Sequence, residues 1–283
     1  MSVCKLSLFG VLLASATLLS AAADAQSVTI QSGTTSGNQV LANPGDVGII
    51  ESGGTIDAIT DGIDAVSMDD DAQFLENRAG GLISQSGNLA AGILSNGLDA
   101  NILNSGSILT TGDASYAIIT LKDRAYVDNG AEIESQGPAA AGIVSGADDA
   151  VIKNSGSIRV TGIAASGVIL DGLDGSFENS GSIETIDATS SGILVNKAGT
   201  IITNSGRIIS PLLNTSEAIG IGANNVTLNL LAGTAVQGSI NVFGNGGAVN
   251  IGKGLNTALT FNLFNPVFLD TGGNPFATNG GLL

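Results

Sequence analysis

The chain has 283 residues, a net charge of −16, 41 glycines, one cysteine and no histidine or tryptophan. Without histidine, the chain cannot carry a Ser-His-Asp or Cys-His nucleophile system or a His-ligated zinc site. The acidic balance argues against nucleic acid and anionic lipid as partners.

The N-terminus is typical of a secretory signal peptide, which we predict over residues 1–25. Lys5 supplies the positive charge, an apolar stretch runs from Leu6 to Leu19, and Ala23-Asp24-Ala25 fits an A-x-A cleavage site. The single cysteine, Cys4, lies inside this leader. We therefore expect an exported chain that folds without disulfide bonds.

Residues 26–50 follow the leader without a clear repeat, and we predict that they form an irregular N-terminal cap over the end of a solenoid. Ile56, Val66 and Phe74 then predict one looser coil. Asp69-Asp70-Asp71 in this coil has two interpretations, a cation site or a solvated turn, of which we favour the turn.

The strongest signal in the chain is a tripeptide Asn-Ser-Gly, followed two places later by Ile, that recurs every 25 residues. The copies begin at Asn104, Asn154, Asn179 and Asn204, and a degenerate copy at Asn129 fills the gap. A fixed period of this length indicates a solenoid.

Two further columns share this period, so each repeat carries three short apolar runs separated by small polar residues. One column follows a Gly or Ala and the other comes nine places later; they read Ile93, Ile118, Ile143, Val168, Ile193 and Ile102, Val127, Ile152, Phe177, Ile202. Such runs are typical of strands and turns. The sequence therefore predicts an all-β chain, a right-handed parallel β-helix with coils of about 25 residues, over residues 51–261.

The repeat loses its regularity after Leu228 but stays strand-like through Val236, Val249 and Phe261. Residues 262–283 are rich in Gly and Pro, and we predict a linker or tail there.

The Asn-Ser-Gly-x-Ile coils, together with the closing run from Asn225 to Gly238, resemble the passenger domains of autotransporters, the type V secreted proteins of Gram-negative bacteria. The resemblance covers about residues 50–265. It implies a cell-surface, outer-membrane or secreted location and an adhesin-like role. The hydrolase-type passengers of this family are not expected here, because the chain after the leader has neither histidine nor cysteine. It also implies an outer-membrane translocator barrel as partner, which we do not find in this chain, and host-cell or matrix glycans or proteins as ligands.

The alternative from another class is a carbohydrate-active β-helix, a polysaccharide lyase or glycosidase. Asp174, Glu178 and Glu184 are the carboxylates that such an enzyme could pair. Its basic partners are spread over four coils: Lys122, Arg124, Lys153, Arg159, Lys197 and Arg207. We favour a non-enzyme and assign no catalytic, cofactor or metal residue.

Two residue sets have both a structural and a binding interpretation. The Asn column could bind sugar or ice, but we favour stacked amides that hydrogen-bond along the axis, with Asn in left-handed turns. Tyr116 and Tyr126 could contact a glycan, but we favour packing at the coil edge. A regular Thr face for ice is the weakest interpretation, because only Thr111-Gly112 and Thr161-Gly162 match.

Overall fold

The computed structural model describes residues 25–211, 216–253, 255, 258–265 and 267–271. The predicted signal peptide therefore lies outside the described residues, apart from Ala25. The described residues contain strands and turns, and no helix among them has the length and hydrophobicity to cross a membrane.

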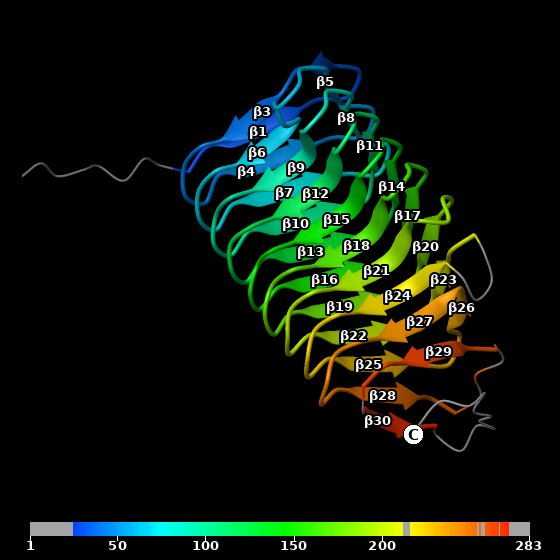
Figure 1. The fold of residues 1–283 in the computed structure, drawn as a ribbon. Coiled ribbons are helices and arrows are strands. Elements are labelled where there is room, and N and C mark those ends of the chain that lie inside the picture. Colours follow the sequence, from blue (N-terminus) through cyan, green and yellow to red (C-terminus); the bar gives the residue numbers. More distant parts are fainter. Residues whose placement is uncertain (1–24, 212–215, 254, 256–257, 266, 272–283) are drawn as a thin grey trace, which may run out of the picture.

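The chain winds through three parallel sheets, which appear as three rows of strands along the molecule (Figure 1). Sheet A contains β1 (Ser27–Ile30), β4 (Val47–Ile50), β7 (Phe74–Asn77), β10 (Asn101–Asn104), β13 (Tyr126–Asn129), β16 (Val151–Asn154), β19 (Ser176–Asn179), β22 (Ile201–Asn204), β25 (Thr227–Leu230), β28 (Ala248–Ile251) and β30 (Phe268–Asp270). Sheet B contains β2 (Thr35–Ser36), β5 (Thr55–Ala58), β8 (Leu82–Gln85), β11 (Ser107–Thr110), β14 (Glu132–Ser135), β17 (Ser157–Val160), β20 (Ser182–Thr185), β23 (Arg207–Ile209) and β26 (Ala235–Gln237). Sheet C contains β3 (Gln39–Leu41), β6 (Val66–Met68), β9 (Ala91–Ser95), β12 (Tyr116–Thr120), β15 (Ala141–Ser145), β18 (Ser166–Leu170), β21 (Ser191–Val195), β24 (Glu217–Ile221), β27 (Ser239–Val242) and β29 (Thr260–Leu263).

The predicted parallel β-helix is confirmed, because each strand pairs in parallel with the equivalent strand of the next coil. Ile108 pairs with Ile133 in sheet B, Ile118 with Ile143 in sheet C, and Val127 with Ile152 in sheet A. In each pair the two partners are separated by one sequence repeat. The three apolar columns therefore define the three sheets.

Coil length changes toward both ends of the solenoid. Val28 pairs with Gly48 and Val249 with Leu269, so these coils are shorter than the regular repeat. Leu75 pairs with Ile102, across a coil that is slightly longer than the regular repeat. The looser coil predicted around Ile56 is one of these longer coils. Turns thus absorb insertions and deletions while the strands keep their register.

The irregular conformation predicted for residues 26–50 is wrong. β1 to β4 fill this range, and they continue all three sheets. The shorter spacing of these strands hid them from a search for the regular repeat. At the other end, β29 and β30 extend sheets C and A up to Asp270, into the predicted tail. The remainder of that tail, residues 272–283, lies outside the described residues.

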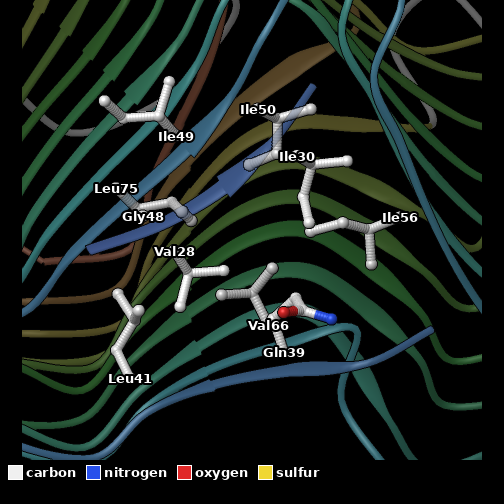
Figure 2. Close-up of a pocket in the computed structure, with 10 residues that line it drawn as sticks. All are labelled: Val28, Ile30, Gln39, Leu41, Gly48, Ile49, Ile50, Ile56, Val66 and Leu75. Carbon is white, nitrogen blue, oxygen red and sulfur yellow. The ribbon is translucent and has the colours of Figure 1, made fainter. Parts of the chain in front are cut away.

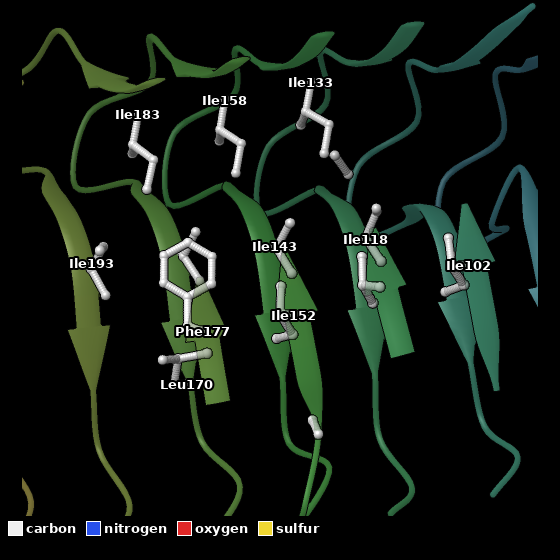
Figure 3. Close-up of a cluster of buried hydrophobic side chains, with 14 of the residues drawn as sticks. Ile102, Ile118, Ile133, Ile143, Ile152, Ile158, Leu170, Phe177, Ile183 and Ile193 are labelled. Carbon is white, nitrogen blue, oxygen red and sulfur yellow. The ribbon is translucent and has the colours of Figure 1, made fainter. Parts of the chain in front are cut away.

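The core is a continuous stack of aliphatic side chains between the three sheets. Ile133, Ile158 and Ile183 project from sheet B toward Ile118 and Ile143 of sheet C (Figure 3). The whole Ile column of sheet B is at most 1% exposed: Ile108, Ile133, Ile158, Ile183 and Ile208. Each coil therefore buries its apolar residues on its neighbours, as a solenoid requires.

A column of small residues marks the corner before the core Ile of sheet C. A Cβ placed on Gly167 would lie 2.4 Å from Ile183 Cγ2 and 2.5 Å from the carbonyl oxygen of Gly192. Ala117 and Ala218 occupy the same column and are fully buried. At Gly167 even a methyl group would therefore require Ile183 or the Gly192 carbonyl to move, whereas the coils with Ala117 and Ala218 already hold a methyl group at this position.

Candidate functional site

A ladder of asparagine amides runs through the core of sheet A, in the column with Asn77 as its first member. In each step, Nδ2 of one Asn donates to Oδ1 of the Asn in the next coil, at 2.6–2.8 Å. All members are at most 1% exposed: Asn77, Asn104, Asn129, Asn154, Asn179 and Asn204. The preferred structural interpretation of the column is confirmed, since side chains buried in this way cannot bind an external ligand.

The ladder has defined ends. Ile50 takes the same position before Asn77, and Leu230 takes it after Asn204. Asn204 Nδ2 instead donates to Thr234 Oγ1 at 3.2 Å and to the carbonyl oxygen of Gly206 at 3.1 Å. Asn77 Oδ1 is buried and receives no hydrogen bond from the described residues. The amide of Asn204 is therefore hydrogen-bonded at the C-terminal end of the ladder, whereas the Oδ1 of Asn77 lacks a donor at the N-terminal end.

The left-handed turn expected for these asparagines is wrong. Each ladder Asn ends a strand, and the positive φ angles belong to turn residues such as Asp99, Arg124, Asp149 and Asp174. These four residues occupy the equivalent turn, between sheets C and A, in four successive coils. Stacking of the coils gives this turn the same backbone conformation whether the residue is Asp or Arg. The preference of Asn for left-handed turns does not predict which residues have positive φ here, because stacking of the coils sets the turn conformation whatever the residue type.

The three candidate catalytic carboxylates lie on different parts of one coil. Asp174 is in the turn between sheets C and A, Glu178 is on the exposed face of β19 in sheet A, and Glu184 is on the exposed face of β20 in sheet B. A pair of catalytic carboxyl groups must face one substrate bond from both sides. The coil does not bring these three side chains into such an arrangement.

The basic residues are likewise distributed, and several pair with carboxylates along the coil axis. Arg159 Nη1 lies 2.8 Å from Glu134 Oε1, and Arg159 Nε lies 3.8 Å from Glu184 Oε2, on the outer face of sheet B. Arg124 Nε donates to Asp99 Oδ1 at 2.6 Å, and this hydrogen bond lowers the pKa of Asp99. Since all these groups are partly exposed, each pair contributes little to stability.

The other basic candidates lie in sheet A, in sheet B and in the turns between sheets C and A. Lys153 is in β16 and Arg207 in β23, whereas Lys122 and Lys197 are in the turns. Lys153 Nζ lies 5.8 Å from the ring centroid of Tyr126. The sequence places the six basic residues on four coils, and the structure distributes them over two sheets and the turns between sheets C and A.

The Asp69-Asp70-Asp71 segment forms a hydrogen-bonded turn. Asp71 Oδ1 accepts the backbone N–H of Leu98 at 2.8 Å, and Asp70 Oδ1 accepts that of Asp71 at 2.8 Å. Asp69 Oδ1 accepts from Asn96 Nδ2 at 3.1 Å. Each carboxylate therefore stabilises its own turn or the turn of the next coil. Among the described residues, no group of three or more acidic side chains has the arrangement of a metal site.

The two tyrosines lie in successive strands on either side of the turn between sheets C and A. Tyr116 is in β12 and Tyr126 in β13, and both are half-buried. Tyr126 Oη lies 3.4 Å from Asp128 Oδ2 within its own strand. Tyr126 therefore contacts its own strand through its hydroxyl and Lys153 of the next coil through its ring.

Two carboxylates near the N-terminal coils have shifted pKa values of opposite sign. Burial alone would raise the pKa of Asp46, but N–H donors from Gln26, Asn43 and Ala42 outweigh burial and lower it. Burial raises the pKa of Asp64, and the N–H of Ala91, which donates to Asp64 Oδ1 at 2.7 Å, offsets it only in part. Their partners are backbone amides, so both shifts reflect turn structure rather than a reactive site.

The structure contains a small apolar gap near the N-terminal coils, shown in Figure 2. Its volume is about 210 Å³, which includes open solvent. Gly48 stands where most other coils have an aliphatic residue, and Leu75 fills part of the space. The lining is aliphatic apart from Gln39: Val28, Ile30, Leu41, Ile49, Ile50, Ile56, Val66 and Leu75. A gap without acid, base or nucleophile offers no catalytic group.

The sequence interpretation missed one surface feature, an apolar stripe on the outer face of sheet C. It consists of Leu94, Ile119, Val144, Ile169 and Leu194, each directly after a buried core residue. Because each stripe residue adjoins a core residue, the pair forms one apolar run in the sequence. Only the alternation of strand side chains separates the two faces.

Comparison with known proteins adds no relative. No family model matches the chain, and neither a curated protein nor a solved structure matches it. The fold and the arrangement of its surfaces are therefore the basis for any statement about function.

Proposed function

We propose that this protein is an exported, non-enzymatic, adhesin-like surface protein, the passenger of an autotransporter-type system in a Gram-negative bacterium. One observation carries the proposal. The solenoid presents three long outer faces, while its candidate catalytic carboxylates lie on different parts of the coil. Repeated faces of this kind suit many weak contacts, which gain strength through multivalent display.

Export is the second element of the proposal, and the residue pattern at positions 1–25 supports it. The partner that export to the surface would require is an outer-membrane translocator barrel. The ligands would be glycans or proteins of a host cell or matrix. The acidic charge of −16 makes nucleic acid an unfavourable partner.

Expression of the full chain with a C-terminal tag in a Gram-negative host tests export. We expect N-terminal sequencing of the processed protein to begin at Gln26, and we expect a variant with Lys5→Glu and Leu12→Asp to remain unprocessed in the cytoplasm. An unprocessed wild-type chain in the cytoplasm would contradict export. Both substitutions lie in the leader, so the experiment tests export and does not alter the sequence of the solenoid.

An activity assay separates the proposal from a carbohydrate-active enzyme. The purified chain is incubated with polyuronides, with and without calcium, and the release of unsaturated or reducing ends is measured. We expect no turnover above a buffer control. Turnover that disappears on Glu184→Gln or Glu178→Gln, in a variant with unchanged circular dichroism, would overturn the proposal.

A further inference from the structure

The described residues contain three Asn-Gly pairs, Asn96-Gly97, Asn129-Gly130 and Asn245-Gly246, and a fourth, Asn279-Gly280, lies outside them. An Asn-Gly pair can modify itself, because glycine has no side chain to hinder attack of its backbone nitrogen on the preceding amide. The three pairs share this chemistry but lie in different surroundings. Their reactivity can therefore be ranked from the structure.

The reaction needs water and no enzyme, metal or oxidant. The glycine N–H loses its proton to solvent, its nitrogen bonds to Cγ of the asparagine, and Nδ2 takes up a proton and leaves as ammonia, which closes a succinimide ring. Water then breaks one of the two carbonyl–nitrogen bonds of the ring. The product is aspartate, or isoaspartate, in which the backbone runs through Cβ and Cγ. The attack requires a free glycine N–H, an asparagine side chain that can rotate and a backbone that can move.

The Asn129-Gly130 pair meets none of these three requirements. Asn129 is fully buried in the ladder, where Oδ1 accepts from Asn104 Nδ2 at 2.7 Å and Nδ2 donates to Asn154 Oδ1 at 2.7 Å. The N–H of Gly130 donates to the carbonyl oxygen of Asn104 at 2.8 Å. Since the attack must break these bonds and rotate a buried side chain, the ladder protects Asn129 from the reaction.

The Asn245-Gly246 pair has the opposite surroundings. It lies in the turn between β27 and β28, both residues are exposed, and Gly244 and Gly247 flank it. Among the residues that the structure describes, neither the side-chain amide of Asn245 nor the N–H of Gly246 has a hydrogen-bond partner. The attacking nitrogen and the amide are therefore both free, and three glycines make the backbone around them easy to move.

The Asn96-Gly97 pair is intermediate. Asn96 is half-buried, and its Nδ2 donates to Asp69 Oδ1 at 3.1 Å. Gly97 is buried, and a Cβ placed on it would lie 1.8 Å from the carbonyl oxygen of Asp70, so this turn packs directly on the preceding coil. A reactive conformation requires the two coils to separate locally, so this pair should react more slowly than Asn245-Gly246.

We propose that Asn245 is a site of spontaneous deamidation, where the turn between β27 and β28 converts to aspartate and isoaspartate while the ladder keeps Asn129 as an amide. Protection of Asn129 matters, because deamidation there would place a carboxylate without a counterion among buried amides. This inference goes beyond the proposed function. It concerns the covalent state of the purified chain and holds whether or not the protein is exported or binds cells.

The consequence at Asn245 is a change of charge with retention of the fold. The new carboxylate adds one negative charge to a chain of net charge −16. Isoaspartate also adds a methylene to the backbone of the turn. Coils of different length already stack at this end, where Val249 pairs with Leu269 across a short coil, so the turn can absorb the added atom. The modified chain should elute as a more acidic form on anion exchange, with unchanged circular dichroism.

Peptide mapping of the purified full chain tests the proposal. The chain is incubated at mildly alkaline pH, which favours loss of the glycine N–H proton, and is sampled over time. Trypsin places Asn96, Asn129 and Asn245 on separate peptides, residues 79–122, 125–153 and 208–253, and fragmentation in the mass spectrometer locates the modified residue. We expect deamidation at Asn129 to be at least about a hundredfold slower than at Asn245. Core strands open with free energies near that of global unfolding, and about 2.7 kcal/mol already gives this factor.

The same incubation in urea is the matched control, because unfolding removes the protection without changing the sequence. We expect the three pairs to react at similar rates there. Asn245→Gln should abolish modification at this turn and leave the other two peptides unchanged, since the longer side chain does not form the succinimide. Asn154→Ala removes an acceptor of Asn129 Nδ2, so it should accelerate deamidation at Asn129 and not at Asn245. Equal rates at Asn129 and Asn245 in the folded chain, or an unmodified Asn245 where the urea sample reacts, would overturn the inference.

Discussion

Replacement of one ladder asparagine is the sharpest test of how the coils are held together. Asn154 lies in the middle of the ladder, accepts from Asn129 Nδ2 at 2.7 Å and donates to Asn179 Oδ1 at 2.8 Å. Asn154→Ala removes both bonds. Asn129 Nδ2 keeps the carbonyl oxygen of Ala131 at 3.0 Å, but Asn179 Oδ1 loses its ladder donor in the buried core.

The magnitude follows from these contacts. A buried acceptor left without a donor costs about 1–3 kcal/mol. The cavity left by the amide adds about 1 kcal/mol, because neighbouring coils cannot collapse without moving their strands. We therefore expect Asn154→Ala to lower the free energy of unfolding by about 2–4 kcal/mol.

The matched control is Asn229→Ala in β25. Asn229 also belongs to an axial pair, since Asn250 Nδ2 donates to Asn229 Oδ1 at 2.8 Å and Asn229 Nδ2 donates to Thr203 Oγ1 at 3.3 Å. This pair lies on the half-exposed outer face, where water can replace the lost bonds, so we expect a loss below about 1 kcal/mol. Urea unfolding followed by far-ultraviolet circular dichroism compares the two variants. Equal losses would refute the reasoning that burial makes the ladder stabilising.

Three further variants test the core, the corner and the electrostatics. Ile158→Asp should destabilise by several kcal/mol, because it buries an unpaired charge, whereas Ser157→Asp on the outward side of the same strand should be nearly neutral in urea unfolding. Gly167→Val should cost about 1–3 kcal/mol by overpacking against Ile183, and an unchanged urea midpoint would refute the crowded corner. Asp64→Asn should raise the melting temperature at pH 7, because it removes a carboxylate whose folded-state pKa is raised. That gain should fade as pH falls through the raised pKa toward about 3.9, where the wild-type carboxyl is protonated in both states; an equal gain at pH 3 would contradict this cause.

The sequence predicts the regular part of the fold because the stacking period fixes it. The columns that contain Ile108, Ile118 and Val127 follow that period, and each column becomes one sheet. The period does not predict the strands of the terminal coils. Val28 and Gly48, for example, are register partners but lie closer in sequence than one regular repeat. A strand pair with a different turn length keeps its register in space while losing its period in the sequence.

The surfaces are harder to predict than the core for a related reason. Val144 follows the core residue Ile143, so inward and outward apolar residues merge into one run. The sequence correctly predicts that the Asn column forms a ladder but wrongly predicts left-handed turns for it, because Asn favours such turns whereas the ladder residues are buried at strand ends. Asp174 and Glu184 are close in sequence, but a coil places them on different parts of its perimeter.

Cell binding by the purified full chain is the measurement that tests the proposed role most directly. The wild type is compared with a variant lacking residues 154–178, one coil whose removal joins equivalent neighbours. We expect a folded protein about 4.8 Å shorter that binds cultured cells or their glycans with only partly reduced strength, since the remaining coils supply equivalent contacts. Asp174→Asn and Glu184→Gln should bind as the wild type does. Complete loss of binding or activity on either single substitution, in a protein that still folds, would contradict the account and favour a discrete site.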